Sequence, residues 1–137
     1  IDTLVEARRR GVDVQIIVPG PKIDVGVTRR ASRALWGRLL EAGVEIWEYQ
    51  PTMYHCKVMV VDDLWVSVGS TNFDNRSFRM NDEANLNLLD ADFARLQVEI
   101  FEADRARSRP ISLEEWKRRP MSEKIMEHAS ALLRPLL

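Results

Sequence analysis

Three side chains that can donate, accept or move protons stand close together in the middle of the sequence. His55 and Lys57 are two residues apart, and Asp62 follows five residues later. Alternate residues of an extended strand project from the same face, so His55 and Lys57 are expected to point together, with Cys56 on the other side. This spacing pairs an imidazole, which titrates near neutral pH, with an ammonium group.

A second set of polar residues follows, with the loop Gly69-Ser70-Thr71-Asn72 and then Glu83. A phosphodiester repels nucleophiles, and the transition state for its cleavage spreads negative charge over oxygens that a Lys and an Asn can bind. A histidine can attack the phosphorus or protonate the leaving oxygen. A carboxylate, from Glu83 or Asp62, would orient the imidazole ring. Together these residues predict half of a phosphodiester active site.

The combination carries this prediction, because a lone histidine in an apolar strand is more often packed or exposed than catalytic. HCKVMVVD fits H-x-K-x-x-x-x-D, GSTN follows, and NDEANL contains a further acid. At this point the sequence resembles the phospholipase D superfamily, which has that first motif, a G-S/G-x-N loop and a later Glu or Asp. The resemblance implies catalytic roles for His55, Lys57, Asp62, Asn72 and Glu83, and phosphate binding by His55, Lys57, Ser70, Asn72 and, in second place, Arg76.

Within that superfamily the chain most resembles bacterial cardiolipin synthases, in which a GSxNxDxRSFxxNxE string is typical. The stretches ARRRGVDVQIIVPGPKID and LLEAGVEIWEYQP resemble their second half, and LLRPLL resembles their end. The resemblance implies an α/β fold, a phospholipase D-like αβα sandwich with a mixed, largely parallel central sheet. It also implies a phosphatidyltransferase or phosphodiesterase that acts on phospholipids through a phosphohistidine intermediate.

A working site of this superfamily needs two such motifs facing each other, and this chain has one. The resemblance therefore implies the C-terminal half of a two-motif enzyme, inactive alone, in which His55 protonates the leaving alcohol. The expected partners are a phosphatidylglycerol-like phospholipid and a second half, in the same longer chain or in a homodimer. Two alternatives stay open, namely a phospholipase D-like nuclease acting as a homodimer and a non-catalytic partner half.

Composition agrees with one compact unit. The chain has 137 residues, 45% of them hydrophobic, so a single domain over residues 1–137 is expected. Lys plus Arg number 20 and Asp plus Glu 21, so nothing in the charge totals demands a nucleic acid or an anionic membrane, and nucleic acid is not the expected partner. The opening IDTLVEARRRG has no Met, and we expect the amino-terminal part of the domain to be missing.

Cofactors, metals and membrane spans are not expected. The lysines and amides supply the positive field that a divalent ion gives elsewhere, and His, Cys and Asp are not clustered at metal spacing. Cys56 is expected to be reduced and to pack as a small hydrophobe. With no apolar run long enough to cross a bilayer, the fragment is expected to be soluble and the full-length protein to work at the cytoplasmic face of a bacterial membrane.

The first fifty residues show a strand-helix-strand pattern. Helices are predicted over residues 2–10 and 28–42, each ended by a glycine, and strands over residues 12–18 and 44–50. Such a pattern predicts two parallel strands joined by a right-handed crossover.

The middle of the chain predicts a hairpin and a third strand. Asp62 and Asp63 form the turn between CKVMVVD and LWVSVG, which favours a structural role for Asp62. In the polar loop after Asn72, Arg76 has three open roles, since it can pair with Asp74, stay in solvent or bind phosphate. EANLNLLD then alternates, and Glu83 begins its polar face.

The last third is predicted to be helical. A helix capped by Asp90 or Asp92 carries an apolar stripe, expected in the core, made of Phe93, Leu96, Ile100 and Phe101. Two helices follow over residues 112–119 and 121–137, the first with a capping box from Ser112 to Glu115. The basic and apolar side chains of this tail leave peripheral contact with anionic lipid open beside simple docking on the domain.

Overall fold

The computed structural model describes residues 1–22, 26–72 and 81–132, and within them every side chain except those of residues 26–31 and 127–132. The chain folds into two compact units. Of the described residues, the first unit contains 1–54 and 107–132, and the second contains 55–106. Each unit has its own three-stranded sheet.

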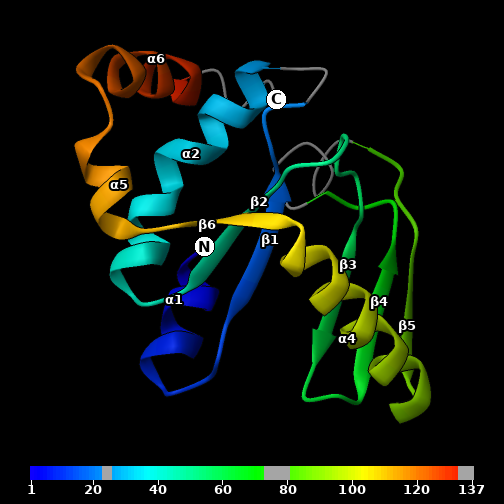
Figure 1. Cartoon of the computed structure of the whole chain (residues 1–137). Coiled ribbons are helices and arrows are strands. Elements are labelled where there is room, and N and C mark those ends of the chain that lie inside the picture. The colour runs from blue at the N-terminus through cyan, green and yellow to red at the C-terminus, as the bar shows by residue number, and fades with distance from the viewer. Residues whose placement is uncertain (23–25, 73–80, 133–137) are drawn as a thin grey trace. The chain divides into compact units, whose positions relative to one another are not determined.

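The described residues of the first unit form the sheet β1-β2-β6 and four helices (Figure 1). Strands β1 and β2 are parallel, and β6 pairs with β2 in the antiparallel sense. The elements are α1 (Asp2–Arg9), β1 (Gln15–Pro19), α2 (Gly26–Glu41), β2 (Glu45–Tyr49), β6 (Ser108–Ile111), α5 (Leu113–Arg118) and α6 (Met121–Leu132). The predicted strand-helix-strand unit is confirmed, although the first strand starts at Gln15 instead of residue 12.

Two glycines direct the chain from helix to strand in this unit. Gly11 follows α1 with φ 92°, and Gly43 follows α2 with φ 87°. Residues with a Cβ avoid this left-handed region, whereas glycine occupies it freely. The helix ends predicted from these glycines are confirmed.

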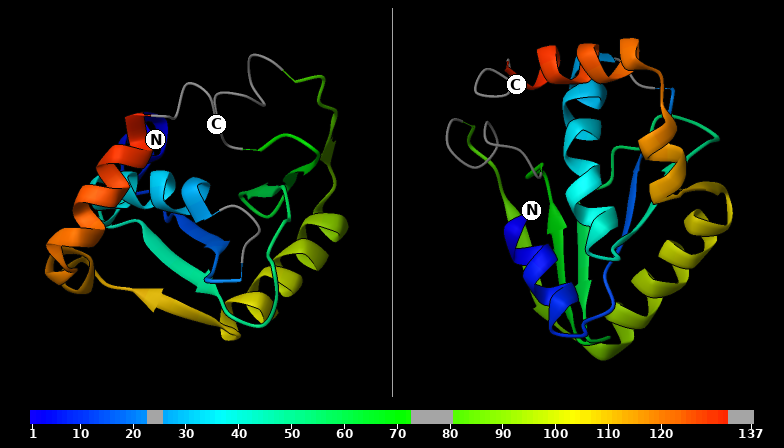
Figure 2. Two further views of the ribbon diagram at one scale, coloured as in Figure 1. Left: turned by 90° about the horizontal axis from the view of Figure 1, so that it is seen from above. Right: turned by 90° about the vertical axis from the view of Figure 1, so that its left-hand side faces the viewer.

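The core of the first unit is formed by α1, α2 and the sheet. Its buried residues are Val5, Trp36, Leu39, Val44, Ile46 and Ile111. Helix α5 docks through Trp116, whose Nε1 donates to the main-chain oxygen of Arg33 at 3.1 Å and whose ring lies over Gly37. Helix α6 packs against α2 (Figure 2).

One carboxylate lies inside this unit. Glu48 on β2 is 1% exposed; one of its oxygens accepts from Arg109 at 2.8 Å, and the other lies 3.5 Å from Arg33. Arg109 also pairs with Glu115, and the hydrogen bonds that Arg109 donates to Glu115 and Glu48 raise its pKa. A buried charge without a partner is strongly unfavourable, so the two arginines make Glu48 tolerable in the core.

The second unit is an antiparallel sheet, β3-β4-β5, with α4 packed against β3 and β4 (Figure 1). Its elements are β3 (Val58–Val61), β4 (Trp65–Gly69), β5 (Asn85–Leu89) and α4 (Ala91–Ala106). Val66 on β4 and Ala94 on α4 are fully buried. Asp90 caps α4, because its Oδ1 accepts from the amides of Asp92 and Phe93 at 3.0 and 2.9 Å. The predicted hairpin, third strand and helix cap are confirmed.

The mixed α/β class is confirmed, and parallel pairing within the described strands is limited to β1 and β2. The predicted core stripe of α4 is wrong at Leu96 and Ile100, which are 49% and 47% exposed, whereas Phe93 and Phe101 are half-buried. The buried positions of α4 are Ala94 and Asp104, and the small side chain of Ala94 lets a helix approach closely.

Strand β6 was not predicted. It contains Pro110, which is tolerated because β6 is an edge strand.

Candidate active site

The first motif lies at the amino end of β3. His55 and Cys56 are exposed and Lys57 is half-buried. The amide of Gly69 donates to the main-chain oxygen of Lys57 at 3.2 Å, which extends the β3–β4 pairing by one residue. The ammonium of Lys57 donates to the main-chain oxygen of His55 at 3.0 Å. The expectation that Cys56 packs as a small hydrophobe is wrong, because it precedes β3 and is exposed.

The loop that carries Asn72 is attached to the start of β5. The amide of Ser70 donates to the oxygen of Ala84 at 3.0 Å, and the hydroxyl of Ser70 accepts from the amide of Ala84 at 3.1 Å. One residue further, the amide of Thr71 donates to Oδ1 of Asn85 at 3.2 Å. The hydroxyl of Ser70, a predicted phosphate ligand, is therefore bonded to the main chain in this structure.

The glycine of this loop is required by space. A Cβ on Gly69 would lie 2.2 Å from the main-chain oxygen of Ala84 and 2.2 Å from Oδ1 of Asn85. Real atoms do not approach so closely, so only a hydrogen fits between β4 and β5 here. This contact gives a physical reason for glycine at the first loop position.

Strand β4 brings three motif segments to one end of the sheet. Its Gly69 is bonded to Lys57 on one side and paired with Asn85 on the other. In one register row, paired residues project from the same sheet face, so Lys57 and Asn85 share a face. Glu83 lies two residues before Asn85, and its Oε1 accepts from Nδ2 of Asn81 at 3.3 Å. The main chain near His55, Asn72 and Glu83 thus converges at this end.

Asp62 lies at the opposite end of β3. It and Asp63 have φ of 52° and 51°, and the amide of Leu64 donates to the oxygen of Val61 at 3.2 Å. This is the two-residue turn with left-handed centres that hairpins prefer. Five residues of extended chain, about 16 Å, separate Asp62 from Lys57. The structure does not bring Asp62 to the other motif residues.

Arg76 and Asn85 differ in what the structure adds to the predicted site. Arg76 lies outside the described residues. Asn85 was recognised in the sequence only as part of a polar strand face, and its contact with the loop was missed. This contact follows from the pairing of Gly69 with Asn85. It could be predicted only if the register between the two strands were known.

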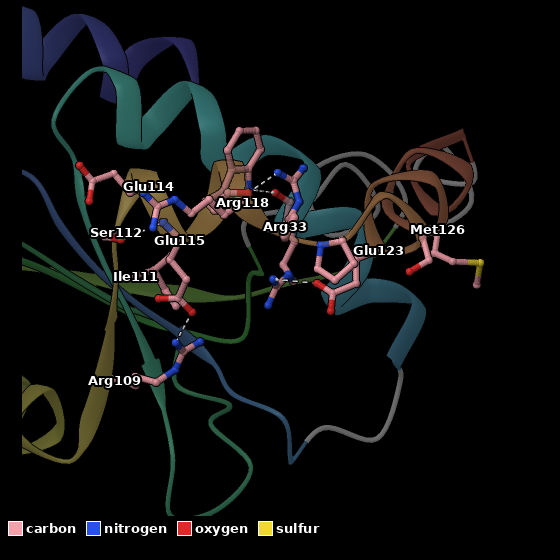
Figure 3. A pocket seen from close by; sticks show the side chains of 13 residues that line it. Arg33, Arg109, Ile111, Ser112, Glu114, Glu115, Arg118, Glu123 and Met126 are labelled. Carbon is pink, nitrogen blue, oxygen red and sulfur yellow. Dashed lines mark hydrogen bonds and ion pairs between the residues drawn. The ribbon is translucent and has the colours of Figure 1, made fainter.

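A separate depression of about 900 Å³ lies in the first unit (Figure 3). Its lining includes Arg33, Arg109, Glu115 and Glu123, and these charges are paired: Arg33 lies 3.5 Å from Glu123, and Arg109 pairs with Glu115. Its described lining residues include no histidine. This depression is an ion-paired region of the first unit.

Across residues 1–22, 26–72 and 81–132, no three His, Cys, Asp or Glu side chains are grouped so as to hold a metal ion. None of the helices described has the length and apolar character needed to cross a bilayer.

The fold and the convergent motif define an α/β domain of the phospholipase D type. Residues 1–105 match the family model described as "Cardiolipin synthase, PLD-like domain", and the chain belongs to this family.

Similar sequences are cardiolipin synthases. The chain is 40% identical over 127 residues to a cardiolipin synthase of Geobacillus sp. (strain WCH70), covering 93% of this chain and 25% of that protein. It is 39% identical over 137 residues to the major cardiolipin synthase of Bacillus subtilis (strain 168), covering 100% of this chain and 28% of that protein. The chain thus spans about a quarter of the length of the curated relatives it matches.

Solved structures share the fold. Nuc from Salmonella typhimurium, a phospholipase D family member, matches with a TM-score of 0.71 and 28% identity over 81% of this chain and 72% of that chain. The phosphatidylserine synthase of Haemophilus influenzae Rd KW20 matches with a TM-score of 0.73 over 99% of this chain and 38% of that chain. At 20% identity, the second likeness concerns the fold alone.

Proposed function

We propose that the chain is the C-terminal half-site of a phosphatidyltransferase of cardiolipin synthase type. The observation that carries the proposal is the convergence of His55 and Lys57 with the Asn72 loop at one end of the β3-β4-β5 sheet, where Gly69 is bonded to Lys57. At this end His55 is exposed, and the ammonium of Lys57 donates to the main-chain oxygen of His55. A histidine and a cationic donor are the groups that transfer of a phosphatidyl group requires.

The proposed reaction has two steps. The histidine of a second motif attacks the phosphorus of a phosphatidyl lipid, so a P–N bond forms and a P–O bond breaks. Lys57 and Asn72 bind the anionic oxygens, and His55 gives its proton to the departing alcohol. The oxygen of a second lipid alcohol then attacks phosphorus, the P–N bond breaks, and the alcohol's proton passes to His55. Glu83 is proposed to orient the imidazole of His55.

The second motif is proposed to come from another half in the same longer chain or from a second copy of this chain. The isolated chain is then inactive as a monomer. Light scattering of the 137-residue chain, with turnover of a chromogenic phosphodiester, tests this. Turnover by a monomer would contradict the half-site, and a dimer that cleaves DNA would favour the nuclease alternative. A half that stays inactive when it is joined to a second motif would favour the non-catalytic alternative.

The role of His55 is tested by His55→Ala in a two-motif protein, with phosphatidylglycerol as substrate. Loss of general acid catalysis is expected to lower turnover by about 10²–10⁴-fold. His128→Ala, at the other histidine of the chain, is the matched control and is expected to leave turnover unchanged. Activity surviving unchanged in His55→Ala would refute the proposal.

A second substrate distinguishes whether His55 acts as the general acid or as the nucleophile. A phosphodiester with a p-nitrophenol leaving group needs little protonation, so His55→Ala is expected to form the covalent intermediate with it nearly as fast as the unsubstituted protein. If both substrates lose the same factor, His55 is the nucleophile instead.

Peripheral contact with lipid is proposed through α6. Met121 and Ile125, one helical turn apart, are 68% and 62% exposed, and such apolar side chains insert at membrane interfaces. Sedimentation with vesicles rich in phosphatidylglycerol tests this contact. Replacing both residues by Ser is expected to lower the bound fraction, and an unchanged fraction would argue for simple docking of α6.

A further inference from the structure

Asn85, on β5, uses both ends of its side-chain amide. Its Oδ1 accepts from the amide of Thr71 at 3.2 Å, and its Nδ2 donates to Oγ of Ser67 at 3.3 Å. A backbone N–H can only donate, so the side-chain atom that faces Thr71 must be the oxygen. The side chain therefore connects the middle of β4 to the loop beyond it.

The contact with Thr71 falls where the β4–β5 ladder ends. The last register pair is Gly69 with Asn85, and the last backbone bond runs from the amide of Ser70 to the oxygen of Ala84 at 3.0 Å. At Thr71 the acceptor is a side-chain oxygen instead of a backbone carbonyl. The loop can thus leave the sheet while its amide stays bonded, and the next residue is Asn72.

Gly69 belongs to the same arrangement. A Cβ at this position would lie 2.2 Å from Oδ1 of Asn85 and 2.7 Å from its Cα. The amide of Asn85 therefore lies across the space that the glycine leaves open. The motif glycine and this strand asparagine are complementary in shape as well as adjacent in register.

We propose that Asn85 is a positioning residue that sets the main chain at Thr71 and thereby the direction of the Asn72 side chain. The role of Asn72 in phosphate binding rests on the proposed function, whereas the contact between Thr71 and Asn85 does not. Asn85 itself touches no substrate in this proposal. It acts by holding the loop in the geometry that phosphate binding uses, so that little ordering is needed on binding.

The same strand offers a matched control. Asn87 is two residues further along β5, pairs with Ser67 in the register and projects from the same sheet face as Asn85. It is exposed and two register rows further from the loop. Replacing Asn87 removes the same chemical group from the same face without removing the acceptor of Thr71.

The first measurement is amide hydrogen exchange of Thr71 in the 137-residue chain by NMR. Asn85→Ala is expected to speed this exchange about tenfold by removing the hydrogen bond. Asn85→Asp is expected to restore protection, because a carboxylate oxygen also accepts, and Asn87→Ala is expected to change nothing. Exchange unchanged in Asn85→Ala, or equally fast in Asn87→Ala, would overturn the proposal.

The exchange of the buried Val66 amide reports whether the second unit remains folded in each variant. If Asn85→Ala unfolds that unit, Asn85→Ser replaces it, since the shorter hydroxyl side chain fills part of the space and does not reach as far toward Thr71. The same outcomes then apply to that variant.

The second measurement is titration with inorganic phosphate, followed through the side-chain amide of Asn72. The Kd is expected to rise about tenfold in Asn85→Ala and less than twofold in Asn87→Ala, and equal effects would overturn the proposal. Lys57→Ala is the comparator that should lose binding. If the unsubstituted chain binds no phosphate, the proposed function fails, and the exchange of Thr71 alone decides the role of Asn85.

Discussion

The ammonium nitrogen of Lys57 lies 3.0 Å from the main-chain oxygen of His55 and donates a hydrogen bond to it. The cation is thereby held against the peptide that carries the imidazole. Lysine has three donors, so this contact leaves further N–H bonds for an anion at the same place. One side chain can therefore fix the local backbone and attract a phosphate.

Replacing Lys57 by Met keeps the aliphatic stem and removes the donor. In a two-motif protein acting on phosphatidylglycerol, we expect turnover to fall by about 10²–10³-fold, as when one donor to a developing oxyanion is lost. Lys117→Met is the control, because Lys117 pairs with Glu41 at 3.3 Å in the first unit. Turnover within about twofold of the unsubstituted protein would remove Lys57 from the proposed site.

Gly69→Ala is expected to lower the free energy of unfolding of the second unit by about 1–3 kcal/mol, because the added methyl overlaps the backbone of β5. Gly11→Ala has no atom within 4 Å but a strained φ, so about 1 kcal/mol is expected there. Urea unfolding measures both. Equal stability of Gly69→Ala and the unsubstituted chain would mean that β4 and β5 separate easily at this end.

The substitution Asp62→Asn distinguishes a structural role of Asp62 in the turn from a catalytic role of its carboxylate. Asparagine also accepts the left-handed conformation, so stability and turnover are expected to be retained. Asp62→Val is expected to lower the free energy of unfolding by about 1–2 kcal/mol, and Asp63→Val should behave alike. If Asp62→Asn alone abolished turnover while Asp63→Asn did not, the carboxylate of Asp62 would have a direct role in the reaction.

Arg109→Leu leaves the buried Glu48 with one arginine fewer. The free energy of unfolding is expected to fall by about 1–3 kcal/mol, because a buried acceptor loses a charged donor. The control Lys117→Ala breaks an ion pair whose two side chains are each 55% exposed, and at most about 0.5 kcal/mol is expected. Thermal or urea unfolding compares the two. Equal effects would mean that Arg109 contributes no more than a surface ion pair.

Local sequence patterns predicted most elements because each depends on neighbouring residues. Gly11 and Gly43 mark helix ends, Asp62 and Asp63 mark the hairpin, and Ser112 caps α5 by accepting from the amide of Glu115 at 3.0 Å. The carboxylate of Glu115, however, pairs with Arg109. Arg109 lies six residues earlier, on β6. The capping pattern concerns only the first turn of α5 and could not predict a partner on that strand.

The features that were missed depend on register and on which side of an element is covered. The contact of Asn85 with Thr71 follows from pairing 14 residues away, which no local pattern specifies. The exposure of Leu96 and Ile100 depends on how α4 is rotated against its sheet, and apolar spacing does not determine that rotation alone. Strand β6 was not predicted because it contains a proline. A strand accommodates proline at the edge of a sheet, and the sequence alone does not show that β6 is an edge strand.

Cys56 is the single cysteine of the chain, and it is exposed between His55 and Lys57. A maleimide dye or a nitroxide would therefore attach to this chain at one defined place, next in sequence to His55, with no added cysteine. Its emission or mobility would register the arrival of a headgroup or of a second half in real time. The same thiol makes alkylating reagents in purification buffers a hazard to any activity assay.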